Sequence, residues 1–75
     1  MDLSFRDFKD PREALKALEK RKKELEDELE KLVKRKNKGE INEEEFHEYR
    51  NKIEREYIEV MDRLAQLRFI ISGGF

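Results

Sequence analysis

The sequence predicts an all-α protein, an antiparallel helical hairpin built from two long, coiled-coil-like helices. Two observations predict this fold class. Apolar residues recur every three or four positions over two long stretches, which is the spacing of residues on one face of a helix. Between the stretches lie Gly39 and the capping sequence Asn42-Glu43-Glu44-Glu45. Because helices of similar length joined by a short link pack antiparallel, a hairpin follows.

A chain of 75 residues can form one domain at most. We divide it into an arm at residues 1–9, a helical hairpin at residues 10–72 and a tail at residues 73–75. The arm is expected to lie as an extended or one-turn segment over another apolar surface. Its apolar side chains are Leu3, Phe5 and Phe8.

The first helix is expected over residues 11–37. Asp10 is its cap, Pro11 takes the first helical position, where a missing amide hydrogen costs nothing, and Glu13 completes a capping box. The remaining apolar residues then line one side of the helix as a heptad seam with two lysine interruptions. The seam consists of Leu15, Leu18, Lys22, Leu25, Leu29, Leu32 and Lys36, flanked by Ala14 and Val33.

The turn is expected at residues 38–42. Gly39 suits the left-handed backbone conformation just past a helix end. The residues Asn42-Glu43-Glu44-Glu45 can form a capping box, in which the first and last side chains each bond the other's backbone amide. Ile41 and Phe46 have the spacing of a hydrophobic staple. Together these residues specify where the second helix begins.

The second helix is expected over residues 43–71. Residues 9–38 carry twelve basic and eight acidic side chains, a net charge of +4, whereas residues 40–63 carry four basic and nine acidic side chains, a net charge of −5. These opposite charges favour pairing of the first helix with the second. The seam of the second helix consists of Phe46, Arg50, Ile53, Tyr57, Val60, Leu64, Leu67 and Ile71.

Individual charges are expected to pair mainly within each helix, at the spacing i, i+4. The run from Lys20 to Lys23 is expected to be a solvated face. Lys22 and Arg50 fall on the seams, so they are expected to snorkel or to pair between the helices. The expected intrahelical pairs are Glu19 with Lys23, Asp27 with Lys31, Glu30 with Lys34, Glu48 with Lys52 and Glu59 with Arg63.

The apolar residues of the second helix are unevenly distributed, and this distribution predicts the function. In its second half they spread around more of the circumference than one partner helix covers. Two isolated helices also bury little surface for a stable fold. We therefore expect a structural or protein-interaction module that forms a homodimer, paired as a four-helix bundle, or docks on a larger partner; a monomer whose arm covers this surface is the alternative. The predicted interface residues are Leu3, Phe5, Phe8, Tyr57, Ile58, Met61, Leu64, Ala65, Phe69 and Ile70.

Two other binding functions are alternatives. A basic cluster near the turn is typical of helical arms that contact nucleic acid, although no aromatic residue lies within it in the sequence, and cations near a helix C-terminus also stabilise that terminus. The cluster consists of Lys31, Lys34, Arg35, Lys36 and Lys38. The apolar residues 69–71, together with the arm, predict peripheral membrane attachment as the other alternative. No apolar run approaches the ~18 residues of a membrane span.

The sequence offers little material for catalysis or metal binding. Glu44-x-x-His47 has the spacing used in di-iron carboxylate bundles and resembles encapsulated ferritins, two-helix protomers whose iron site is completed by a second chain. Because Phe46 faces the core, however, Glu44 and His47 are expected to point outward. The chain has no Cys, no Thr and no glycine-rich phosphate loop. We expect no cofactor, no metal site and no enzymatic activity.

The composition narrows the class of protein. Charged residues make up 49% of the chain, yet the net charge is −1, which argues against a general nucleic-acid or membrane-surface binder. Abundant Lys and Glu without Cys, Thr or Trp is typical of hyperthermophile proteins, and a designed helical protein has a similar composition. The absence of cysteine fits a reducing, cytoplasmic compartment.

The turn also carries two resemblances. Lys38-Gly39-x-Ile41-Asn42-x-x-Glu45-Phe46 resembles the Gly-x-Ile-(Thr/Asn/Asp) helix-turn of the short C-terminal oligomerisation domains of prokaryotes. Extended through Arg50, Ile53, Arg55 and Glu56, it is similar to the paired helices of ESCRT-I core subunits. Either resemblance implies an assembly role, and neither names a family for this chain, because any well-capped hairpin needs the shared residues.

Overall fold

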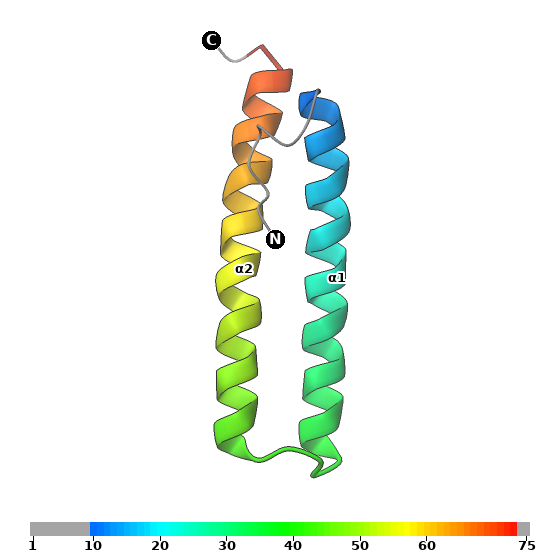
Figure 1. The fold of residues 1–75 in the computed structure, drawn as a ribbon, viewed down its shortest axis with the longest axis vertical. Coiled ribbons are helices and arrows are strands. Elements are labelled where there is room, and N and C mark those ends of the chain that lie inside the picture. The colour runs from blue at the N-terminus through cyan, green and yellow to red at the C-terminus, as the bar shows by residue number, and fades with distance from the viewer. Residues whose placement is uncertain (1–9, 74–75) are drawn as a thin grey trace.

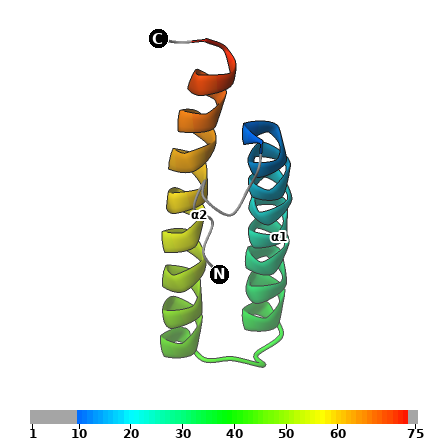
Figure 2. The same ribbon diagram turned by 45° about the horizontal axis from the view of Figure 1, so that its top comes forward.

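A computed structural model describes residues 10–73 and shows two helices, α1 (Pro11–Asn37) and α2 (Glu43–Ile71). The helices lie side by side and antiparallel, joined by one tight turn (Figures 1 and 2). The molecule measures 49 × 19 × 16 Å along its principal axes, so it is a rod. Both helices coincide with the stretches that the apolar periodicity predicts. The predicted interface residues Leu3, Phe5 and Phe8 lie outside the described residues.

Helix α1 begins as its sequence predicts, with one difference. The Asp10 Oδ1 atom accepts a hydrogen bond of 2.9 Å from the Arg12 amide, and Pro11 occupies the first helical position. The Asp10 carbonyl also accepts the Glu13 amide at 3.0 Å. Within the described chain, no bond returns from the Glu13 side chain to Asp10, so the expected capping box is reduced to a simple cap.

The turn closes α1 through two backbone hydrogen bonds. The Gly39 amide donates to the Lys36 carbonyl at 2.9 Å, and the Glu40 amide donates to the Arg35 carbonyl at 3.0 Å. This is the Schellman pattern, in which the residue after the cap takes a left-handed conformation. Gly39 has φ +76°, as predicted. The Arg35 and Lys36 carbonyls near the end of the helix are therefore satisfied by the backbone, without side chains.

The start of α2 has the predicted capping box. The Asn42 Oδ1 atom accepts the Glu45 amide at 2.8 Å, and the Glu45 Oε1 atom accepts the Asn42 amide at 3.3 Å. Ile41 and Phe46, the predicted staple, are both buried together with Leu32 of α1. The turn is thus held by hydrogen bonds on its backbone and by apolar contact beneath it.

The core is a single seam between the helices with two clusters of buried side chains. Near the turn, the tip cluster contains Leu32, Ile41 and Phe46. Toward the helix ends away from the turn, the base cluster contains Ala14, Leu18, Leu25, Val60, Leu64 and Leu67. Ile53 packs against both clusters and makes the seam continuous. Each fully buried leucine contributes about 1.5–3 kcal/mol relative to an exposed one.

Candidate interaction surfaces

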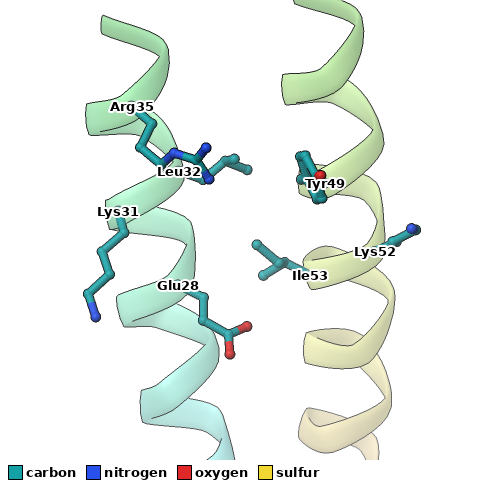
Figure 3. A pocket seen from close by; sticks show the side chains of 7 residues that line it. All are labelled: Glu28, Lys31, Leu32, Arg35, Tyr49, Lys52 and Ile53. Atoms are coloured by element: carbon teal, nitrogen blue, oxygen red, sulfur yellow. The ribbon is translucent and has the colours of Figure 1, made fainter. Parts of the chain in front are cut away.

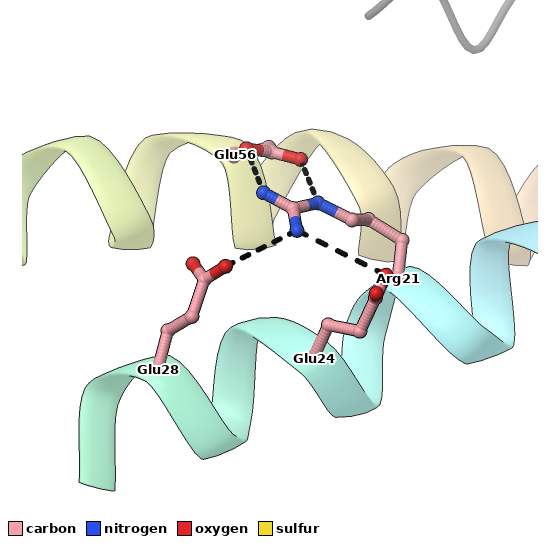
Figure 4. Close-up of polar contacts among 4 residues, drawn as sticks. All are labelled: Arg21, Glu24, Glu28 and Glu56. Atoms are coloured by element: carbon pink, nitrogen blue, oxygen red, sulfur yellow. Dashed lines mark hydrogen bonds and ion pairs between the residues drawn. The ribbon is translucent and has the colours of Figure 1, made fainter. Parts of the chain in front are cut away.

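One side of the seam carries a charged cluster centred on Arg21 of α1 (Figure 4). Its guanidinium donates two hydrogen bonds to the Glu56 carboxylate of α2, through Nε to Oε2 and through Nη2 to Oε1 at 2.8 Å. Nη1 lies 3.3 Å from Glu28 Oε1 and 3.9 Å from Glu24 Oε1. Arg21 is therefore surrounded by three carboxylates, one of them across the helix interface.

The prediction of a solvated Lys20–Lys23 run is wrong for Arg21. Its side chain is only 23% exposed, because it follows Leu18 by three positions and precedes Leu25 by four, next to the seam. The bond to Arg21 lowers the pKa of Glu56, and the same bond raises the pKa of Arg21. These spacings could have identified Arg21 from the sequence, but they could not name its partner.

The opposite side of the seam carries two further polar contacts between the helices. The Tyr57 hydroxyl donates a hydrogen bond of 3.1 Å to Glu26 Oε2, and Arg68 Nη2 lies 3.5 Å from Glu19 Oε1. Desolvation, followed by the hydrogen bond to Glu26, raises the pKa of Tyr57. The two helices are thus linked by polar groups on both sides of the apolar seam.

Only part of the expected intrahelical pairing is present. The predicted pairs of Glu30 with Lys34 and of Glu59 with Arg63 form, at 3.3 Å and 3.0 Å. The Glu19 carboxylate contacts Arg68 of α2 instead of pairing with Lys23, because the packing of the two helices brings Arg68 Nη2 to 3.5 Å from it. The i, i+4 spacing within one helix is therefore not sufficient to predict which cation a carboxylate contacts.

At the tip, cations enclose the ring of Phe46. Lys36 Nζ lies 4.5 Å from the ring centroid and 2.9 Å from Glu43 Oε1, and the Arg50 guanidinium lies 5.6 Å from the same centroid. Arg50 pairs with Glu54 at 3.6 Å, four positions along α2, so the alternative of an interhelical pair for Arg50 is wrong. Lys36, which the sequence also places on the seam, forms an interhelical ion pair instead, with Glu43 of α2.

The Glu44-x-x-His47 spacing is not assembled into a metal site. His47 Nε2 lies 3.4 Å from Glu43 Oε2, and both side chains are mostly exposed. Bonding to Lys36, with a smaller effect of His47, lowers the pKa of Glu43. Across residues 10–73, no three Asp, Glu or His side chains are close enough together to hold a metal ion.

Apolar side chains of α2 form an exposed band that we call the α2 stripe. Ile58 is 61% exposed, Met61 36% and Phe69 53%. With the exposed Ala65, they follow one another at intervals of three and four residues, which places them on one face of the helix. The α2 stripe consists of Ile58, Met61, Ala65 and Phe69.

The remaining predicted interface residues of α2 have different positions. Leu64 is fully buried against α1, so it belongs to the core of the hairpin and not to its exposed surface. Leu64 lies in the apolar second half of the helix, but because it is on the seam its side chain packs against α1. Tyr57 is half-buried, and Ile70 is 38% exposed but lies off the α2 stripe.

Near the turn, a shallow groove of about 370 Å³ runs between the helices (Figure 3). In the figure Leu32 and Ile53 point toward each other and Tyr49 lies beside them. Lys31 and Lys52 extend outward from the two helices at its edges. We call this site the tip groove; its lining residues are Glu28, Lys31, Leu32, Arg35, Tyr49, Lys52 and Ile53.

The tip groove changes one interpretation of the basic cluster, namely that no aromatic side chain lies near its cations. The sequence places no aromatic residue among these cations, but the fold brings Tyr49 of α2, 46% exposed, to the same groove as Lys31 and Arg35 of α1. Tyr49 lies three positions after Phe46 and four before Ile53, beside the seam, so its location is readable only once the hairpin is known.

Three of the five residues in the basic cluster already lie close to carboxylates. Lys34 lies 3.3 Å from Glu30, Arg35 lies 3.6 Å from Glu40, and Lys36 pairs with the Glu43 carboxylate. The remaining two members, Lys31 and Lys38, have no carboxylate within 4 Å in the part of the chain that the structure describes.

Neither of the two described helices has a stretch long and apolar enough to cross a membrane. No protein-family model, curated protein or solved structure matches the chain. The functions of these surfaces are therefore inferred from their geometry and chemistry.

Proposed function

We propose that this hairpin is an assembly module that pairs with a second copy of itself through the α2 stripe. The observation that carries the proposal is the exposure of Ile58, Met61 and Phe69 on one helix face, away from the seam. Contiguous apolar surface of this kind is typical of protein–protein interfaces, whereas isolated exposed apolar residues are not. Two hairpins joined in this way contain four helices, the smallest assembly of this type.

The modest core supports the same proposal. The buried side chains form one seam between two helices, with no third layer over it in residues 10–73. Small domains of this kind bury too little apolar surface to be very stable, and oligomerisation is a common remedy. A net charge of −1 also leaves little overall repulsion between copies. Association would add apolar burial where the isolated hairpin lacks it.

Nucleic-acid binding is the weaker alternative. Three of the five basic residues near the turn, Lys34, Arg35 and Lys36, already lie close to carboxylates. The turn and the first part of α2 add the acidic residues Glu40 and Glu43 to Glu45, which repel phosphate groups. The local field is therefore mixed in sign, whereas nucleic-acid surfaces are predominantly basic.

The proposal is tested by replacing Met61 with Glu and measuring solution mass by light scattering over a hundredfold range of concentration. Wild-type protein is expected to exceed the monomer mass of 9.2 kDa. The Met61→Glu variant is expected to stay monomeric, because a carboxylate in the α2 stripe must be desolvated on association. Gln66→Glu is the matched control, since it adds the same charge at an exposed position outside the α2 stripe.

Each outcome has a defined meaning. Dissociation by Met61→Glu but not by Gln66→Glu supports the α2 stripe as the interface. Equal masses for wild type and the Met61→Glu variant contradict it. A wild type that is monomeric throughout rejects self-association and leaves docking on a different protein as the remaining form of the module.

A further inference from the structure

We propose that the tip groove of one chain receives the α2 stripe of a second chain, so that copies join head to tail. This inference rests on the proposed self-association and adds which two surfaces meet. It assigns the occupant of the tip groove as Ile58 and its acidic neighbours on another copy.

The tip groove is apolar at its floor, and its edges carry the cations Lys31 and Lys52 and one carboxylate, Glu28, which already pairs with Arg21. Tyr49, 46% exposed, and the half-buried Ile53 supply most of the accessible apolar surface, and the buried Leu32 lies beneath them. Lys31 and Lys52 have no carboxylate within 4 Å among residues 10–73, although both were expected to pair within their helices. Lys52 Nζ lies instead 6.0 Å from the centre of the Tyr49 ring. The site therefore has two uncompensated positive charges beside uncovered apolar surface.

The α2 stripe has the complementary pattern. Ile58 is the most exposed of its large apolar side chains, at 61%. Glu54 lies four positions before it and Asp62 four positions after it, so both carboxylates share its face of the helix together with one cation, Arg55, three positions before it. Asp62 has no ion pair within the described residues, and Glu54 has only the 3.6 Å contact with Arg50. An apolar side chain between two carboxylates thus matches an apolar groove between two lysines.

Charge also opposes pairing of like surfaces. Two α2 stripes placed face to face would bring Asp62 and Glu54 of both copies together, and two tip grooves would bring together Lys31 and Lys52. Like charges across an interface disfavour the complex, whereas opposite charges steer the partners together. The favoured contact is therefore between the two unlike surfaces.

The two surfaces lie on different sides of α2. Ile58 follows Lys52 by six residues, which at about 100° per residue places them about 120° apart around the helix. Because the two surfaces face different directions, one contact between a tip groove and an α2 stripe does not bring the other groove and stripe of the pair together. The pair is therefore not a closed two-fold dimer, and one tip groove and one α2 stripe remain free at its ends. The assembly is thus a chain of hairpins that lengthens with protein concentration.

The test uses two variants that each block one surface. Lys31→Glu/Lys52→Glu reverses the charge of the tip groove, and Ile58→Glu disrupts the α2 stripe. Wild-type mass, measured by sedimentation velocity, is expected to rise with concentration beyond the dimer. Each variant alone is expected to remain monomeric, with helix content by circular dichroism as in wild type. An equimolar mixture is expected to form a dimer and nothing larger, because it holds one intact contact.

The control is Lys16→Glu/Lys20→Glu, which makes the same charge change at exposed positions of α1 away from both surfaces. It is expected to assemble as wild type does. A wild type that stops at a dimer unaffected by the tip-groove variant overturns the head-to-tail inference and leaves the proposed function standing. A monomeric wild type overturns both.

The mixture gives the decisive result. If the two blocked variants do not combine, the tip groove and the α2 stripe are not partners, even if each variant is monomeric. A fluorescent oligothymidylate tests the other occupant of a cationic, aromatic groove. Binding that weakens with salt and is lost in Lys31→Glu/Lys52→Glu, with wild-type mass fixed at the monomer, assigns the tip groove to nucleic acid and overturns the inference.

Discussion

Arg21 of α1 and Glu56 of α2 are joined by two parallel hydrogen bonds, one from Nε and one from Nη2. A guanidinium held by both oxygens of a carboxylate has one favourable relative position, so the pair restricts sliding of the helices along their shared seam. Leucine seams repeat every seven residues and tolerate a shifted alignment more easily. A polar pair of this geometry therefore contributes specificity to a fold whose apolar core is repetitive.

Replacing Arg21 with Lys is expected to destabilise the monomeric hairpin by about 1 kcal/mol, because an ammonium cannot form the paired bonds. The side chains are 23% and 36% exposed, so solvent keeps the effect small. Urea unfolding followed by circular dichroism at low protein concentration measures it. A double-mutant cycle with Glu56→Gln should give a coupling energy of about 0.5–1 kcal/mol. Additive effects of the two substitutions would show that the pair does not contribute to stability.

The same pair predicts a pH dependence. The pKa of Glu56 is lowered in the folded hairpin by its bond to Arg21. The unfolded chain therefore binds this proton more readily, and the stabilisation is present above the ordinary glutamate pKa of about 4.3 and is lost as pH falls through the lower folded value. The melting temperatures of wild type and the Glu56→Gln variant are expected to differ at pH 6 and to converge near pH 2.5. A difference that stays constant with pH contradicts this linkage.

Leu64 and Ile58 are expected to contribute very differently to the stability of the monomer, because Leu64 is a core side chain and Ile58 belongs to the exposed α2 stripe. Leu64→Ala removes a fully buried side chain and is expected to cost about 2–5 kcal/mol, a large part of the stability of a small domain. Ile58→Ala removes a similar volume from a side chain that is 61% exposed, so it is expected to change monomer stability by under about 0.5 kcal/mol. Thermal unfolding of both variants at low concentration compares them. Similar losses would place Ile58 in the core of the hairpin.

The turn makes a prediction about backbone conformation alone. Gly39 has φ +76°, and a Cβ atom added there would meet nothing within 4 Å. Gly39→Ala is therefore expected to cost about 1 kcal/mol through the left-handed conformation and not through a clash. Gly39→Asn should cost less, because asparagine adopts this conformation more readily. Equal stability of the Ala variant and wild type would show that the turn changes conformation on substitution.

The sequence predicts this fold well because its strongest signals are local. The end of α1 shortly before Gly39 and the start of α2 directly after Asn42 depend on residues within a few positions of each site, and both agree with the structure. The heptad seam then leaves little choice of architecture. Boundaries and fold class follow from periodicity and capping, without knowledge of which residues meet across the seam.

The candidate surfaces are harder to predict because they combine residues from both helices. In the sequence Arg21 is part of a basic run, and only the fold places Glu56 opposite it. Tyr49 is an isolated aromatic residue in the sequence, and only the fold places it in the same groove as Lys31 and Arg35. Leu64 belongs to the apolar half of α2 by composition but to the core by its angle on the helix. Each of these assignments depends on the rotation of one helix against the other, which the apolar period defines only coarsely.

The short turn between α1 and α2 also has a consequence for the order of folding. Residues that face each other near the turn, such as Leu32 and Phe46, are close in sequence, whereas Ala14 and Leu67 at the other end are far apart. Closing a short loop loses less chain entropy than closing a long one. The hairpin is therefore expected to zip from the turn outward and to unzip from the opposite end. In native-state hydrogen exchange, the amides near Leu18 and Leu64 should then exchange through smaller, more frequent openings than those near Leu32.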